Sequence, residues 1–141
     1  MHDTITDTYT PYEQACSRCI DDLYHTAYLV LVDADAAKKL VTEICVSGVH
    51  KYDNLEDEAE IRFRLTSDLY HRLKRRLRFF IPNTDALPEQ LQILTKQERL
   101  VVAMRFSSGL SATDSGNIVG LSQERFRIVV SDIMRKVPLS V

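Results

Sequence analysis

Residues 94–137 read LTKQERLVVAMRFSSGLSATDSGNIVGLSQERFRIVVSDIMRKV, and they contain three successive helix starts. Thr95-x-x-Glu98 is a capping box ahead of an apolar run, and Ser111-x-x-Asp114 is a weaker form of the same signal. Gly120-Leu121-Ser122 is a turn whose serine can cap a last helix. Two short helices joined by a glycine turn are typical of a helix-turn-helix, which places its second helix in a DNA groove. The stretch therefore predicts a small helical domain that binds DNA.

The residues before this stretch also follow the helical period. Apolar side chains recur at helical spacing from Ala15 to Val32, from Ala36 to about His50 and from about Leu55 to Phe80. Pro11 and Pro88 suit the first turns of two helices. Because no segment alternates as a half-buried strand does, we predict an all-α chain.

A short linker divides the predicted helices into two domains. Pro82 disfavours helix at the residue before it, and turn-forming residues follow. We predict a helical domain over residues 10–80, a linker over residues 81–87 and a helix-turn-helix domain over residues 88–141.

The composition is that of a globular protein. Hydrophobic residues make up 45% of the 141 residues and charged residues 27%, which excludes a disordered chain. No apolar run is long enough to span a bilayer, and the N-terminal residues do not form a signal peptide. We therefore expect a cytoplasmic protein without a membrane partner, in which Cys16, Cys19 and Cys45 are free thiols.

Charge is unevenly distributed along the chain, although the net charge is only −2. Residues 53–60 hold five carboxylates and no base, whereas residues 62–78 hold seven Lys or Arg residues and one Asp. The end of this basic segment can bind phosphates, or it can be a solvated helix face that the acidic segment neutralises. Its candidate DNA-binding residues are Lys74, Arg75, Arg76 and Arg78.

The last predicted helix offers a second candidate DNA contact. Phe126 and Ile133 belong to its apolar stripe, so the polar residues near its start are the candidates that face a groove. Arginine can read guanine and glutamine can read adenine. Glu124 would repel phosphates, which favours a helix-turn-helix retained for packing or dimerisation. The candidates are Gln123, Arg125 and Arg127.

Several short motifs follow one another in an order and spacing that can be compared with known protein families. The N-terminal part carries Leu23-Tyr24-x-x-Ala27-Tyr28, Leu40-Val41-x-Glu43 and Lys74-Arg75-Arg76, and the C-terminal part carries Leu87-Pro88, Glu98-Arg99, Arg105, Gly109-Leu110-Ser111, Asp114 and Gly120-Leu121-Ser122. In order and spacing, the chain resembles bacterial RNA polymerase sigma factors of the extracytoplasmic-function group.

The resemblance implies a function in transcription initiation, without enzymatic activity and without a cofactor. A promoter-melting domain would precede the linker, and a helix-turn-helix reading the upstream promoter element would follow it. The implied partners are the RNA polymerase core, promoter DNA and a regulatory protein such as an anti-sigma factor. The residues that match the family's polymerase-binding segment are Lys39, Leu40, Thr42 and Glu43.

The chain departs from the family pattern at several positions. Lys39 stands where the family carries Asp, and a reversed charge disfavours an electrostatic interface. The chain has no Trp, so Phe63 or Tyr70 would have to serve in promoter melting. Ser115-Gly116 replaces a buried Ile-Ala pair, and Gly within a helix costs roughly 1 kcal/mol relative to Ala.

The predicted linker is also short. It spans roughly 25 Å when fully extended, whereas promoter elements ~17 base pairs apart are separated by roughly 58 Å. This length fits a compact arrangement, with the two halves packed together, at least as well as it fits simultaneous binding of two separate promoter elements.

These departures leave two alternatives to a sigma-like initiation protein. One is a sigma-derived interaction protein that no longer starts transcription, and the other is a dimeric helix-turn-helix repressor. Cys16-x-x-Cys19 with His25 could be read as a zinc site, but no second ligand pair has the right spacing. We expect these cysteines to be small core residues, and we find no pattern typical of a catalytic site.

Overall fold

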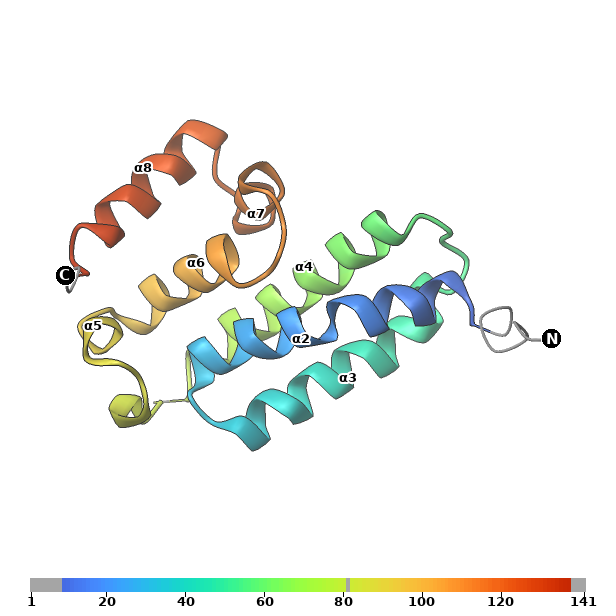
Figure 1. Cartoon of the computed structure of the whole chain (residues 1–141), viewed down its shortest axis with the longest axis horizontal. Coiled ribbons are helices and arrows are strands. Elements are labelled where there is room, and N and C mark those ends of the chain that lie inside the picture. The colour runs from blue at the N-terminus through green and yellow to red at the C-terminus, as the bar shows by residue number, and fades with distance from the viewer. Residues whose placement is uncertain (1–8, 81, 138–141) are drawn as a thin grey trace.

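Residues 9–80 and 82–137 are described by a computed structural model, and all of their regular structure is helical. The prediction of an all-α fold is confirmed for these residues. Ile81, at the start of the predicted linker, and residues 138–141 lie outside the described part. In chain order the elements are α2 (Pro11–Leu31), α3 (Ala34–Tyr52), α4 (Glu58–Arg76), the 3-10 helix η1 (Thr84–Ala86), α5 (Glu89–Gln92), α6 (Lys96–Phe106), α7 (Ala112–Val119) and α8 (Gln123–Met134) (Figure 1).

Capping side chains fix where the long helices begin. The predicted capping box of Thr95 and Glu98 opens α6, and Thr10 with Glu13 forms a second box at the start of α2. Asp57 accepts a hydrogen bond from the backbone N–H of Ala59 and caps α4. For this reason α4 begins at Glu58 and not at the predicted Leu55.

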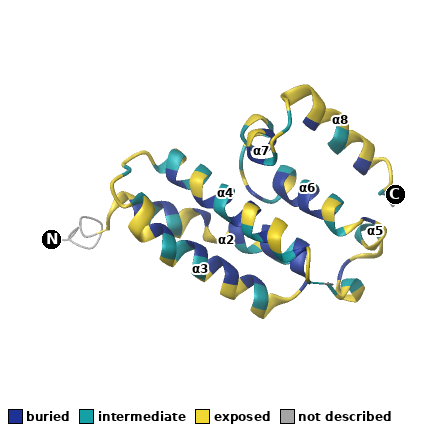
Figure 2. Ribbon diagram, turned by 180° about the vertical axis from the view of Figure 1, so that it is seen from behind, coloured by how far each residue is buried: buried dark blue, intermediate teal, exposed yellow. Residues whose placement is uncertain are grey.

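The first three long helices form a bundle around an aliphatic core. α2, α3 and α4 each pack against the other two (Figure 1). Their inward faces are buried and their outer faces are exposed (Figure 2). The fully buried aliphatic side chains of the bundle include Leu23, Leu31, Leu40, Ile44, Ile61, Leu65, Leu69 and Leu73.

The C-terminal part packs directly on this bundle. α6 contacts α2 and α4, and α7 contacts α4. Leu100, Ala103 and Met104 of α6 belong to the same buried cluster as the core of the bundle. The structure therefore has the compact arrangement that the short linker allows, with one core shared by both halves.

A buried arginine joins the two halves. Arg99 on α6 is only 4% exposed, and its guanidinium donates hydrogen bonds to the carbonyls of Leu29 (3.1 Å), Val30 (3.3 Å) and Leu94 (3.2 Å). Leu29 and Val30 lie in the last turn of α2, where carbonyls lack helical partners and the helix dipole attracts a cation. Burial lowers the pKa of Arg99, but a guanidinium remains protonated in proteins.

A polar cluster strengthens the same junction. Arg62 of α4 forms an ion pair with Asp22 of α2, and it donates a hydrogen bond of 3.2 Å to the carbonyl of Ser108. Gly109 follows with φ +77°, and a Cβ there would collide with the Arg62 guanidinium. A glycine is therefore required at this turn for both conformation and space.

Glu98 links the start of α6 to the end of the chain. Its carboxylate accepts hydrogen bonds from Lys136 and from the backbone N–H of Thr95. These two interactions hold the pKa of Glu98 below the usual range of a glutamate side chain.

The lowered pKa predicts a pH-dependent contribution to stability. A carboxyl group with a depressed folded pKa stabilises the fold above its unfolded pKa, and this contribution is lost as the pH falls through the folded pKa. Glu98→Gln keeps the capping geometry and removes the charge. We expect it to lower the free energy of unfolding by about 0.5–1 kcal/mol at pH 7. In urea titrations, the difference from wild type should shrink as the pH falls below 4.5; an unchanged difference would contradict this role.

None of the helices in residues 9–80 and 82–137 combines the length and the apolar character needed to cross a bilayer.

Candidate nucleic-acid interface

The candidate interface starts from two short helices and the turn between them. The Ser111 side chain accepts a hydrogen bond from the Asp114 backbone and caps α7. α7 ends at Val119, and Gly120 caps it with a φ of +88°, in the left-handed region that favours glycine. Ser122 then caps α8 by accepting a hydrogen bond of 3.1 Å from the N–H of Arg125. Ser111, Gly120 and Ser122 therefore cap the ends of α7 and α8 as the sequence predicts.

α8 is held in place by an aromatic side chain and a glycine. Phe126 is 2% exposed, and a Cβ added to Gly116 of α7 would lie 3.2 Å from its ring. Ser115 is also buried, and its hydroxyl donates a 2.8 Å hydrogen bond to the carbonyl of Met104 on α6. Ser115 and Gly116, which replace the buried Ile-Ala pair of the family pattern, therefore both make specific contacts with the neighbouring helices.

The predicted DNA-reading residues lie on the exposed surface of α8. Arg125 and Arg127 are both exposed. Being two residues apart, they lie on opposite flanks of the helix. The ridge between them carries Glu124 and Ile128, which are also exposed. Gln123 is exposed too, but its amide donates a 2.6 Å hydrogen bond to the hydroxyl of Thr113 on α7.

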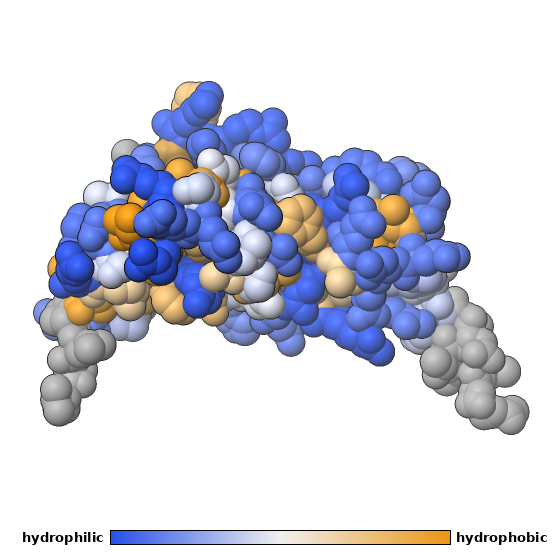
Figure 3. All heavy atoms as spheres, turned by 90° about the horizontal axis from the view of Figure 1, so that it is seen from above, coloured by the Kyte–Doolittle hydropathy of each residue, from blue (hydrophilic) through white to orange (hydrophobic). Residues whose placement is uncertain are grey.

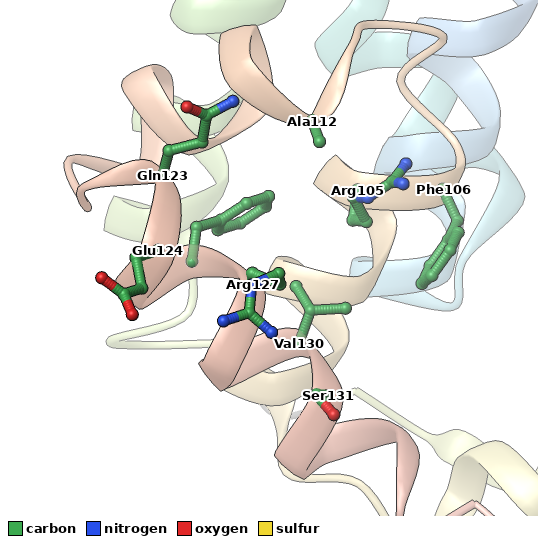
Figure 4. Close-up of a pocket in the computed structure, with 9 residues that line it drawn as sticks. Arg105, Phe106, Ala112, Gln123, Glu124, Arg127, Val130 and Ser131 are labelled. Atoms are coloured by element: carbon green, nitrogen blue, oxygen red, sulfur yellow. The ribbon is translucent and has the colours of Figure 1, made fainter.

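A groove runs between α8 and the end of α6. Its volume is about 680 Å³, and Arg127 and Val130 of α8 face Arg105 and Phe106 of α6 across it (Figure 4). Phe106 is 55% exposed at this edge. The rest of the surface seen from above is mostly hydrophilic, with small separate apolar patches (Figure 3).

The basic end of α4 is free of the acidic segment that could neutralise it. Glu58 and Glu60 of that segment pair with Arg18 and Arg64. Residues 60 and 74 are separated by roughly 21 Å along the helix at 1.5 Å per residue. Lys74, Arg75 and Arg78 are exposed, and they form no ion pair within the described part of the chain.

Arg76 differs from the other residues of the basic cluster. It lies 3.9 Å from the carboxylate of Glu43, which is also 3.4 Å from Arg72. The side chains of Arg76 and Glu43 are therefore engaged with each other across α3 and α4. One predicted DNA-binding residue and one predicted polymerase-binding residue together serve to join two helices.

The predicted polymerase-binding residues on α3 separate into exposed and buried ones. Lys39 and Thr42 are exposed, whereas Leu40 is fully buried in the core. Leu40 therefore cannot contact a partner directly, because its side chain faces α2 and α4. The exposed face continues with Val46 (62% exposed) and Val49 (44% exposed), two apolar residues that the sequence analysis did not select.

The structure also brings Lys96 to the basic end of α4. Lys96 and Gln97 of α6 line a groove of about 430 Å³ together with Lys74 and Arg78, and the Lys96 ammonium donates a hydrogen bond to the carbonyl of Leu77. Because Lys96 and Lys74 lie far apart in sequence, only the packing of α6 on α4 reveals this neighbourhood.

The aromatic residues expected to take part in promoter melting are largely covered. Tyr70 is 5% exposed in the core, and Phe63 is partly buried on α4. Tyr70 therefore cannot stack on a base in this arrangement.

The described residues hold no group of three or more potential ligands that could bind a metal. Comparison with protein-family models, curated proteins and solved structures finds no match to the chain.

Proposed function

We propose that the chain is a sigma-like transcription protein that binds promoter DNA through α8 and the basic end of α4. The observation that carries this proposal is the exposure of Arg125 and Arg127 on a helix whose opposite side is anchored by Phe126. Such a helix can enter a major groove without disturbing its own packing. Lys74, Arg75 and Arg78, which have no ion-pair partner among the described residues, add a surface that attracts phosphates.

Removal of the two α8 arginines tests the DNA-binding part. A bidentate contact from arginine to guanine contributes about 1–3 kcal/mol of discrimination. We therefore expect Arg125→Ala/Arg127→Ala to weaken binding of a selected duplex by about 10–100-fold or more in fluorescence anisotropy. Arg18→Ala on α2 is the matched control and should leave binding unchanged. Equal affinity of the double variant and wild type would overturn the assignment of α8, and no duplex binding at low salt would overturn DNA binding altogether.

The RNA polymerase core is the second proposed partner, and it binds the outer face of α3. Lys39 and Thr42 on this face are exposed, as are Val46 and Val49. Two neighbouring exposed apolar residues on a solvent-facing helix, flanked by polar ones, can contribute to a protein-binding surface. Co-purification with the polymerase core tests this part, with Val46→Asp expected to abolish capture and Ile93→Asp on the C-terminal part expected to retain it. If wild-type protein captures no polymerase but binds DNA, the chain is better described as a helix-turn-helix regulator.

A further inference from the structure

Two cysteines lie where α2 and α3 pack together, one on each helix. Cys16 lies one turn after Tyr12 on α2, and the Tyr12 hydroxyl donates a 2.5 Å hydrogen bond to the backbone carbonyl of Cys45 on α3. Gly48 follows Cys45 by one turn, and a Cβ at Gly48 would collide with the Tyr12 hydroxyl. The two helices therefore approach closely at this point, and Cys16 and Cys45 are both partly buried beside the core.

The side chains of Cys16 and Cys45 are neighbours at this junction, and the proximity of the Cys45 thiol is the main cause that lowers the pKa of Cys16 to about 7. The same proximity, together with burial, raises the pKa of Cys45. The Tyr12 hydroxyl, which donates a hydrogen bond to the Cys45 carbonyl, also lowers the pKa of Cys16.

The third cysteine has a different environment. Cys19 is 1% exposed and points into the core, and burial raises its pKa to about 11. A buried thiol with a raised pKa is unreactive, because the thiolate is the nucleophile. Cys16, which is only partly buried and has a lowered pKa, is therefore the nucleophile among the three, and Cys45 is its neighbour on α3.

We propose that Cys16 is a peroxide-reactive modification site and that Cys45 resolves it by forming an intramolecular disulfide. In the first step, the Cys16 thiolate attacks one peroxide oxygen, the O–O bond breaks, and a sulfenic acid forms while the second oxygen leaves as water after protonation. In the second step, the Cys45 sulfur attacks the Cys16 sulfur and the S–O bond breaks. The Cys45 proton and the hydroxyl leave as a second water, so two thiols are oxidised and one peroxide is reduced.

The disulfide would join α2 to α3 covalently. The S–S bond is about 2.05 Å long, so the two sulfurs must come together to that distance when it forms. The bond would close a loop that contains the end of α2 and the start of α3, which restricts the unfolded chain. Oxidation should therefore raise the thermal unfolding midpoint and should leave the helical content unchanged.

The test uses the full chain, reduced and then treated with hydrogen peroxide. We expect the number of titratable thiols in denaturant to fall from 3 to 1, and the monomer mass to fall by about 2 Da as two hydrogens are lost. Peptide mapping should place the link between Cys16 and Cys45. Retention of all three thiols, a link to Cys19 or a link between two chains would overturn the proposal.

Three variants sharpen this test. Cys45→Ser should trap the sulfenic acid at Cys16, detected as a dimedone adduct, and Cys16→Ser should abolish both the adduct and the disulfide. Cys19→Ala is the matched control and should still form the disulfide. A dimedone adduct at Cys19 or Cys45 in place of Cys16 would contradict the order of reaction. If a variant fails to fold, the peptide map of the oxidised wild-type protein still shows whether the disulfide joins Cys16 to Cys45.

Discussion

Replacement of Arg99 with methionine is expected to lower the free energy of unfolding by about 3–5 kcal/mol. The guanidinium makes three hydrogen bonds to carbonyls of Leu29, Val30 and Leu94. Methionine has a similar length but no donor, so these carbonyls would lose their partners in a buried junction. Urea unfolding followed by circular dichroism measures the change.

Two further variants separate charge from geometry at this position. Arg99→Lys keeps the charge but cannot reach carbonyls in two segments at once, so we expect it to recover only part of the stability. Arg135→Met changes an exposed arginine whose side chain is 78% accessible, and it should have almost no effect. A loss below 1 kcal/mol for Arg99→Met would show that the junction does not depend on this side chain.

Replacement of Phe126 with alanine is expected to cost about 3–5 kcal/mol, as for other buried aromatic residues. Phe126 is 2% exposed and packs on Gly116. The remaining small cluster under α8, formed by Leu94, Val102 and Ile133, is too small to replace it. We therefore expect α8 to separate from α6 and α7, while the bundle of α2, α3 and α4 stays folded.

Hydrogen exchange can distinguish this local loss from global unfolding. In Phe126→Ala, protection should be lost across α7 and α8 and should be retained in α2 and α4. Phe79→Ala is the matched control, because Phe79 is 91% exposed. Uniform loss of protection in every helix would contradict the local role given to Phe126.

Local sequence signals account for much of the fold. Thr95, Ser111, Gly120 and Ser122 are correctly predicted as helix ends, because each acts on backbone groups within four residues of itself. The all-α class follows from the helical spacing of apolar residues.

Contacts between distant segments could not be predicted in the same way. Arg99 is one of the residues that carry the family resemblance, but two of its three carbonyl partners lie about 70 residues away on α2. The pairing of Arg76 with Glu43 and the burial of Leu40 also depend on how α3 packs on α4. Such contacts follow from tertiary packing, which the helical period of one segment does not specify.

The compact arrangement changes how the chain could hold DNA. α6 shares the core of the bundle and also contacts α8, so α8 and the basic end of α4 are connected through packed helices. A protein of this shape would hold one continuous stretch of DNA more readily than two separated promoter elements.

The most direct test of DNA binding by α8 is photo-crosslinking from single positions on the surface. A photoreactive amino acid at Ile128 lies on the exposed ridge of α8, and one at Val46 lies on the outer face of α3. With duplexes selected from a randomised pool, we predict crosslinks to DNA from position 128 and none from position 46. Crosslinks from position 46 alone, or from neither position when DNA is bound, would contradict the assignment of α8 as the DNA-contacting helix.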